Sequence, residues 1–299
     1  MGILFIRVAL ILILTSKRIT NDLTRCLLVT LLSGFFSLSA AAYSNQTGES
    51  KSIYETGRLY IAVENQMAEI DKSLATAKNA GKLALIVMGA NWCHDSRSIA
   101  SNLYLPDIKK SIEKNYELLF VDVGYYSNIK KVINRFGMPI IYSTPTVLII
   151  DPESEQLINR HNMLLMRDAA SVSGLETLQY FEDIATNRER LTKVAVTNKN
   201  SPKLSQLNRS IDDFEELHAK RIYHAFSIIG PLIKEKNQGG DPKEFGKIWK
   251  AISKLRYTIT DDLARLRDQA KQIAQGSDSK GKIKFPKYPA FDWETEDAL

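Results

Sequence analysis

The chain has few cysteines and no long apolar run, and both features limit the classes of protein to which it can belong. Two cysteines, Cys26 and Cys93, occur in 299 residues, so a small fold held together by disulfides is excluded. The main apolar runs near the N-terminus, 3–14 and 26–38, fall short of the roughly 20 residues that a membrane-spanning helix needs. The sequence also lacks an internal repeat, a phosphate-binding glycine loop, and the signatures of serine proteases and zinc hydrolases.

Histidine and net charge give little indication of a metal or polyanion site. His161, His218 and His224 have no cysteine or carboxylate partner at metal-ligand spacing, so we predict no metal site. The formal charge of +6 at pH 7 is weak evidence for a nucleic-acid or membrane partner. Part of the positive charge lies near the N-terminus, at Arg7, Lys17, Arg18 and Arg25. We therefore predict no nucleic-acid partner and no bound cofactor.

The N-terminal segment 1–42 has the features of an export signal. Basic and polar residues 17–25 precede the apolar run 26–38, which ends in small residues up to Ala42. This order is typical of a secretory signal. One interpretation is cleavage near Ala42, with the first apolar run as an extension from an early start codon. The other is an uncleaved helical hairpin that anchors the protein to the membrane. Both predict an exported, periplasmic protein, and cleavage would leave Cys93 as its single thiol.

Residues 50–191 have the pattern of an α/β domain. Apolar runs predict strands at 83–88, 116–123, 145–151 and, more weakly, 156–160. Helices are expected at 53–80, 96–115, 128–136 and 175–190, with a kink or restart near Pro106. This alternation predicts a sheet that contains a parallel βαβ unit and a hairpin, with helices on both faces.

The remainder of the chain is predicted to be helical and then disordered. Residues 192–209 are polar and are interpreted as a linker, and 210–275 as a helical hairpin extension. Pro231 is expected to kink or end the first helix, and Asp241 to cap the second. The tail 276–299 is rich in Gly, Ser, Lys and Pro and is expected to be mostly disordered.

Two motifs within the α/β region resemble a known family. Residues 83–93, ending in Trp92-Cys93, resemble the first central strand and active-site turn of the thioredoxin family. The segment Thr144-Pro145-Thr146, followed by an apolar strand, is similar to the cis-proline segment of that family. The resemblance covers nearly half of the chain. It implies a thioredoxin-like fold, a central mixed sheet flanked by helices, here with a C-terminal α-helical extension. It also implies that Pro145 is cis and that the Thr144 backbone lies beside Cys93, where it can pair with a substrate strand.

The chemistry of this turn centres on the Cys93 sulfur. A thiolate is the reactive form of cysteine, and the free N–H groups of a helix N-terminus favour it. Ser96 is expected to donate a hydrogen bond to the thiolate, and a protonated His94 would add positive charge. Asp95 acts in the opposite sense, because a neighbouring carboxylate disfavours a thiolate. We predict a modest net activation, with Trp92 shaping either the core or a substrate surface.

Two departures from the family pattern limit the predicted activity. Ser96 occupies the position of the second cysteine, so the domain cannot close an internal disulfide. Val87 occupies a position where the family often has a buried acid. The leading hypothesis is monothiol exchange with protein thiols or disulfides, as an isomerase or glutathione-linked oxidoreductase. The alternative is a redox-inactive binding or assembly module of the cell envelope. A third hypothesis, glutathione or iron–sulfur binding, lacks the glycine-phenylalanine pair of glutaredoxin turns.

Overall fold

The computed structural model describes residues 59–127, 129–276 and 282–294. These residues all belong to one structural unit, 52–299. The predicted export signal or anchor, 1–42, lies outside the described residues, as does Cys26. Within the described ranges, no helix combines the length and apolar character that a membrane span requires.

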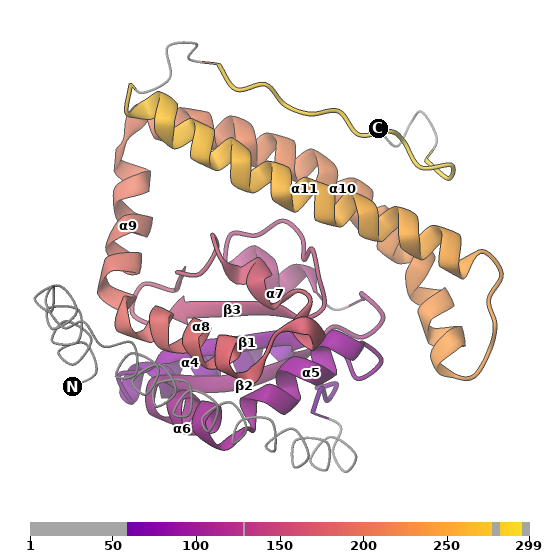
Figure 1. The fold of residues 1–299 in the computed structure, drawn as a ribbon, viewed down its shortest axis with the longest axis horizontal. Helices are drawn as coiled ribbons and strands as arrows, with labels where there is room; N and C mark the ends of the chain where they lie inside the picture. Colours follow the sequence, from indigo (N-terminus) through magenta and orange to yellow (C-terminus); the bar gives the residue numbers. More distant parts are fainter. Residues whose placement is uncertain (1–58, 128, 277–281, 295–299) are drawn as a thin grey trace, which may run out of the picture. The chain divides into compact units, whose positions relative to one another are not determined.

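A mixed four-stranded sheet lies at the centre of the first half of the described chain (Figure 1). In spatial order its strands are β2 (Tyr116–Asp122), β1 (Leu83–Gly89), β3 (Thr146–Asp151) and β4 (Gln156–Leu157). Strand β1 is parallel to β2 and antiparallel to β3, which also pairs antiparallel with β4. The predicted fold class, a mixed sheet flanked by helices with a helical C-terminal part, is confirmed.

Helices cover both faces of this sheet, as predicted. They are α4 (Gln66–Asn79), α5 (His94–Leu103), α6 (Pro106–Asn115), α7 (Lys130–Arg135), α8 (Gly174–Thr186) and the 3₁₀ turns η1 (Met163–Met166) and η2 (Ala169–Ser171). Successive β1 side chains point to opposite faces. Ile86 and Met88 join a core with α4 and α7, whereas Leu85 and Val87 join a core with α5, α6 and α8. Burial on both faces explains the unbroken apolar run of β1.

Strand β4 is shorter than the predicted 156–160 because a side chain replaces its backbone pairing. The Ile158 N–H still donates to the Ile149 carbonyl at 2.9 Å. Beyond it, the buried Asn159 amide accepts from the Ile149 N–H at 2.9 Å and donates to the Val147 carbonyl at 2.8 Å. The side chain thus satisfies the backbone of β3 that a longer β4 would have paired with.

Local capping decides where the early helices begin. The helix expected from residue 53 begins at Gln66, because Asn65 Oδ1 accepts the Ala68 N–H at 3.1 Å and caps it there. Residues 59–65 are not helical, which corrects the sequence prediction. The predicted restart near Pro106 is confirmed: α5 ends at Leu103, and Pro106 occupies the first turn of α6.

Three long helices follow the sheet: α9 (Arg188–Asn200), α10 (Pro202–Asn237) and α11 (Phe245–Ala274). Residues 192–209, interpreted from their polarity as a linker, are therefore helical apart from Ser201. Ser201 has an extended backbone, and Pro202 at the first helical position suits the start of a new helix. The division into domains at 191 and 209 stays a prediction.

Two of the signals expected in these helices do not hold. Helix α10 continues through Pro231 although proline removes one helical hydrogen bond. The side chains of Ile229 and Ile233 on either side are buried in the core, which holds the helix together. Helix α11 begins at Phe245 and is preceded by Glu244 at a positive φ of 62°, so Asp241 is not its cap.

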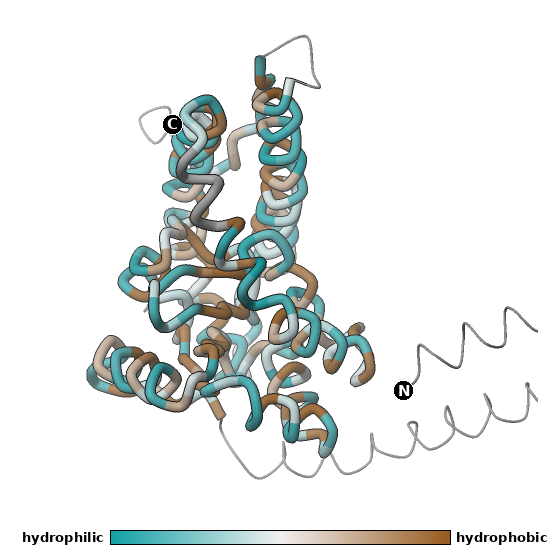
Figure 2. The backbone as a smooth tube through the Cα atoms, turned by 90° about the vertical axis from the view of Figure 1, so that its left-hand side faces the viewer, coloured by the Kyte–Doolittle hydropathy of each residue, from teal (hydrophilic) through white to brown (hydrophobic). Residues whose placement is uncertain are grey.

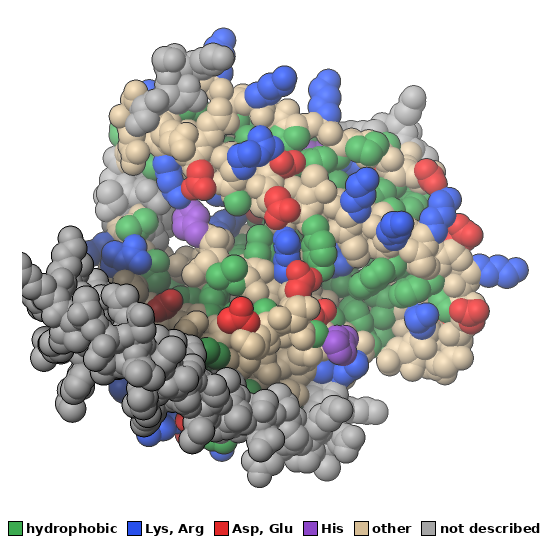
Figure 3. Space-filling view, viewed as in Figure 1, with side chains coloured by type: hydrophobic (Ala, Val, Ile, Leu, Met, Phe, Trp, Pro, Cys, Tyr) green, Lys and Arg blue, Asp and Glu red, His purple; other side chains and the backbone are tan. Residues whose placement is uncertain are grey.

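Helices α10 and α11 form the predicted antiparallel hairpin (Figure 1). Buried apolar residues recur along both helices, and Figure 2 shows apolar and polar residues alternating along the helical parts of the chain. Their apolar side chains join the same core as α4 and α7, so the hairpin packs against that side of the sheet domain. Basic and acidic side chains are interspersed on the face shown in Figure 3.

One buried carboxylate connects the hairpin to the sheet domain. Glu215 of α10 accepts hydrogen bonds from the Tyr142 hydroxyl at 3.0 Å, from Arg160 at 2.9 Å and from Arg267 of α11 at 2.7 Å. Burial, reinforced by the Glu215 charge, raises the pKa of the Tyr142 hydroxyl well above its ordinary value, so it remains a donor. Three donors satisfy this carboxylate, as a buried charge requires.

The C-terminal segment 282–294 differs from the disordered tail predicted for 276–299. Its apolar residues pack against the hairpin core; they are Ile283, Phe285, Tyr288, Phe291 and Trp293. The Tyr288 hydroxyl also donates to Asp262 of α11 at 2.7 Å. The glycine, lysine and proline content indicated disorder, but the regularly spaced aromatic side chains supply enough burial to order this segment.

Gly89, the last residue of β1, is required by a close approach. A Cβ atom there would lie 2.6 Å from the buried Tyr60 ring and 2.7 Å from Ser96 Oγ. We expect Gly89→Ala to lower the free energy of unfolding by about 1–3 kcal/mol, because the buried ring has no space to move into. Chemical denaturation measures the change. Gly246→Ala, where nothing lies within 4 Å of the added atom, is the matched control and should have little effect.

Candidate functional site

Cys93 lies where the central strand passes into a helix. Strand β1 ends at Gly89, and Cys93 is the N-cap of α5. The Cys93 N–H donates to the Ala90 carbonyl at 3.1 Å, which closes the turn between strand and helix. Its side chain is partly exposed and forms no disulfide. Cys93 therefore lies at the N-terminal end of α5, next to the free N–H groups of its first turn.

Thr144 is the direct partner of this sulfur. Cys93 Sγ lies 3.0 Å from the Thr144 carbonyl oxygen and 3.4 Å from Thr144 Oγ1. The thiol form donates to the carbonyl, and the thiolate form can accept from the hydroxyl. The Thr144–Pro145 peptide bond is cis. Thr144 and Pro145 are both buried, Thr144 with 7% of its surface exposed.

Ser96 does not make the expected contact. Its side chain is fully buried, and its hydroxyl has no hydrogen-bond partner among the described residues. The Ser96 backbone carbonyl instead accepts from the Tyr60 hydroxyl at 2.9 Å. Burial, with a smaller contribution from Cys93, raises the pKa of that hydroxyl well above its ordinary value. Tyr60 therefore stays neutral and fixes the first turn of α5.

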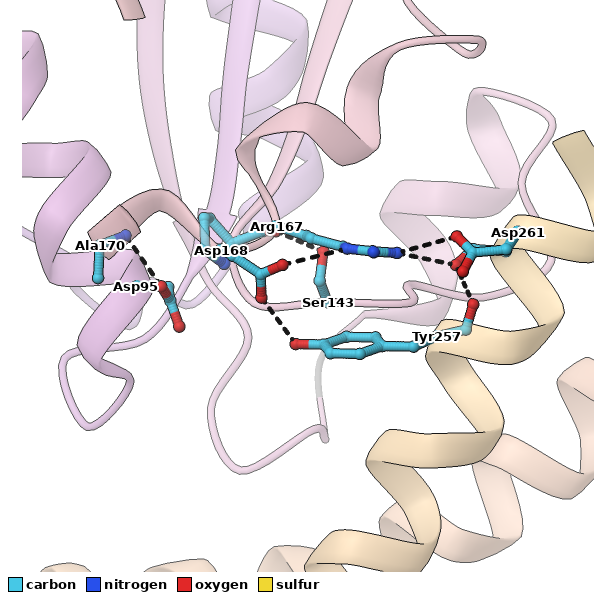
Figure 4. A network of polar contacts seen from close by, with 9 residues as sticks. Asp95, Ser143, Arg167, Asp168, Ala170, Tyr257 and Asp261 are labelled. Carbon is cyan, nitrogen blue, oxygen red and sulfur yellow. Dashed lines mark hydrogen bonds and ion pairs between the residues drawn. The ribbon is translucent and has the colours of Figure 1, made fainter. Parts of the chain in front are cut away.

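The two residues between Cys93 and Ser96 have different surroundings. His94 is exposed to solvent. Asp95 Oδ1 accepts the Ala170 N–H of η2 at 2.9 Å, as Figure 4 shows. We predicted that His94 favours the Cys93 thiolate and that Asp95 disfavours it. In the structure the His94 imidazole is solvated, and the Asp95 carboxylate already has a hydrogen-bond partner.

Trp92 packs against an aromatic pair that the sequence analysis did not single out. Its Nε1–H donates to the Gly124 carbonyl at 2.8 Å. Its ring stacks on Tyr125 with centroids 6.3 Å apart and meets Tyr126 edge-on at 5.5 Å. The sequence could have indicated this pair, because the carboxyl ends of two parallel strands lie at the same edge of a sheet. The turns after β1 and β2 must therefore lie side by side.

Further hydrogen bonds hold the turn itself. Asn91 exchanges hydrogen bonds with the Tyr60 backbone, at 2.7 Å and 3.3 Å. Arg97 Nη1 donates to the carbonyls of Asn91 and Trp92 at 3.2 and 3.3 Å. The residues before Cys93 are thus fixed from both sides.

The described residues offer no metal-binding cluster, and no acid occupies position 87. In the described ranges, no three His, Cys, Asp or Glu side chains lie close enough together to hold a metal ion. Val87 is fully buried in the apolar core with α5, α6 and α8, so no acid lies at that position.

The architecture is consistent with a thioredoxin-like fold: a mixed sheet with helices on both faces and the cysteine turn at the end of β1. No family model matches the sequence, and no curated protein matches it. Among solved structures, the chain is similar to the disulphide isomerase from Xylella fastidiosa Temecula1, with 24% sequence identity and a TM-score of 0.40. That match covers 43% of this chain and 98% of the other.

Proposed function

We propose that this protein is an exported thiol–disulfide exchange protein that uses Cys93 as its single reactive thiol. The observation that supports the proposal is the placement of the partly exposed residue Cys93 at the start of α5, with its sulfur 3.0 Å from the Thr144 carbonyl oxygen. Its substrates are protein thiols and disulfides, in the periplasm or on a membrane-anchored form that faces it. Trp92, His94, Asp95, Ser96, Thr144 and Pro145 surround the sulfur in sequence or space.

The proposed reaction has two exchange steps. The Cys93 thiolate attacks one sulfur of a substrate disulfide, a new S–S bond forms, and the other substrate sulfur leaves as a thiolate that takes up a proton. A second thiol, from the substrate or from glutathione, then attacks the mixed disulfide and releases Cys93 as a thiolate. The protein ends in its starting redox state, which suits isomerisation or glutathione-linked exchange.

The test is reactivation of a scrambled disulfide-containing protein in the presence of glutathione. We expect Cys93→Ser to give only the uncatalysed rate, because a serine hydroxyl stays protonated at neutral pH and does not attack a disulfide. Ser96→Ala is the matched control and should keep most of the activity, because its hydroxyl makes no hydrogen bond to the sulfur. Equal rates for the wild type and Cys93→Ser would refute the proposal.

A binding module is the second candidate function. Two observations favour it: the buried Ser96 stands in place of a second cysteine, and the apolar Val87 stands where the family often has an acid for proton transfer. Capture from envelope extract separates the two candidates. Partners retained by Cys93→Ala support a binding module. Partners held only by intact Cys93, and released by a reductant, support exchange.

A further inference from the structure

The C-terminal hairpin is connected to the cysteine turn on both sides of Cys93. The connections end at Trp92, before Cys93, and at Asp95, after it. On one side, Trp92 contacts Tyr126, and Tyr126 contacts α10 and α11. On the other side, Asp95 binds η2, and the residues just before η2 bind α11. The position of the cysteine turn therefore depends on helices that lie more than 100 residues away in the chain.

Tyr126 makes the tighter of these connections. Its ring stacks on Phe226 of α10 with centroids 3.9 Å apart and an interplanar angle of 3°. Its hydroxyl accepts from Arg256 Nη1 of α11 at 3.1 Å. The backbone of Tyr126 is in the left-handed region, with φ of 66°, which non-glycine residues adopt only when their surroundings enforce it.

Arg256 is an unusual residue in this contact. Its side chain is buried, with 3% exposure, and its Nε has no hydrogen-bond partner among the described residues. Its guanidinium lies 5.5–5.8 Å from the ring centroids of Trp249, Phe226 and Tyr126. A cation buried among aromatic faces is attracted to them, so Arg256 fixes the Tyr126 ring as well as its hydroxyl.

Tyr125, the residue before Tyr126, is also held by α10. A Cβ on Gly230 of α10 would overlap the Tyr125 carbonyl oxygen, so helix and loop are in close backbone contact there. Asn237 at the end of α10 donates to the Tyr125 hydroxyl at 3.1 Å. Tyr125 and Tyr126, the two rings against which Trp92 packs, are thus both held by the hairpin.

The second connection runs through polar contacts of η2 and the residues before it (Figure 4). The Tyr257 hydroxyl of α11 donates to Asp168 at 3.0 Å, and Arg167 donates to Asp261 at 3.3 Å. The Asp261 and Asp168 side chains are 70% and 52% exposed, so water and salt screen these contacts. The buried contact through Tyr126 is therefore the stronger of the two.

We propose that Phe226 and Arg256 are positioning residues for Cys93, which act through Tyr126 and Trp92. The inference rests on the proposed exchange function and extends it. An extended peptide disulfide must meet the sulfur, the Thr144 backbone and the Trp92 surface together, so it needs this turn in one fixed geometry. A small aromatic disulfide needs only the sulfur.

The test compares Phe226→Leu and Arg256→Met with the wild type, using the whole purified protein below its unfolding transition. We expect the rate with a peptide disulfide to fall about tenfold, since small misplacements of reacting groups have effects of this size. The rate with a small aromatic disulfide should stay within about twofold of the wild type, because that reaction needs no aligned surface. Arg256→Lys should recover part of the loss.

Hydrogen exchange provides a readout that does not depend on catalysis. The amides of residues 90–93 should exchange faster in both variants, because the Cys93 N–H bond to Ala90 loses its support. Leu266→Ala is the matched control: this fully buried residue lies ten positions beyond Arg256 in α11, roughly 15 Å along the helix. It should lower the free energy of unfolding without changing the peptide-disulfide rate or the amide exchange of residues 90–93.

Two results would overturn the positioning role. One is an unchanged peptide-disulfide rate together with unchanged exchange of residues 90–93 in Phe226→Leu and Arg256→Met. The other is an equal change in Leu266→Ala, which would show general loosening. If instead the wild type has no exchange activity at all, the proposed function fails, and the hydrogen-exchange measurement still decides whether the hairpin holds the turn.

Discussion

Arg221→Met should lower the free energy of unfolding by about 3–5 kcal/mol, because it leaves a buried carboxylate without its partner. Arg221 of α10 binds both oxygens of Glu294, at 2.7 and 2.8 Å, and donates to the Pro289 carbonyl at 2.8 Å. The two charged side chains are only 3% and 1% exposed. Burial opposes the charge on Glu294, but the Arg221 hydrogen bonds outweigh it and lower the pKa of this carboxyl.

Chemical denaturation of matched variants tests this prediction. Arg221→Met combined with Glu294→Gln should recover part of the loss, because it removes the unpaired charge. Lys247→Met is the control, since Lys247 joins the same hairpin to Asp292 of the same segment through a pair that is 66% and 79% exposed. It should cause no measurable change. Equal losses in Arg221→Met and Lys247→Met would show that burial of the pair is unimportant.

The protein should lose about 3 kcal/mol of stability as the pH falls from 6.5 to 4, because of His218. His218 is 7% exposed and packs edge-on against Phe214 and Tyr288. Burial first, and then the charge of Arg221, lower its pKa from 6.5 to about 4, against the opposing effect of Glu294. Below pH 6.5 the unfolded chain binds a proton that the folded protein does not bind, so acid favours unfolding.

Unfolding free energies measured at pH 6.5 and pH 4 would show this loss. His218→Gln should flatten the dependence over this range, because the buried imidazole is gone. His224→Gln, a change at an exposed histidine of the same helix, should keep the wild-type dependence. A pH dependence that is the same in His218→Gln and the wild type would assign the acid sensitivity to other groups, such as the Glu294 carboxyl.

The sheet and the cysteine turn were predictable because their signals are local. The apolar run 83–88 is long enough for a strand and too short for most helices, and the change of pattern at Trp92-Cys93 marks its end. Pro106 likewise predicts a helix boundary from its own geometry, since a proline favours the first turn of a helix.

The parts that sequence reasoning missed depend on distant partners. The composition of residues 282–294 predicted disorder, but their partners lie far away in the chain: Arg221, for example, is 73 positions from Glu294. The burial of Ser96 likewise follows from its packing against Gly89 and Tyr60, which no local pattern reveals. Polarity suggested a linker at 192–209, yet a helix needs only one apolar face, and Leu204 and Leu207 contribute to it.

The order of the chain has a consequence for newly made protein. Tyr126 and Arg256 are separated by 130 residues. During synthesis, the strand and turn that carry Cys93 therefore emerge well before the helix that supplies Arg256. A nascent or truncated chain ending before α11 would have its sulfur but not the guanidinium that packs beneath Tyr126. The thiol is therefore present in the growing chain before the helix that supports its turn, and only the complete chain contains both.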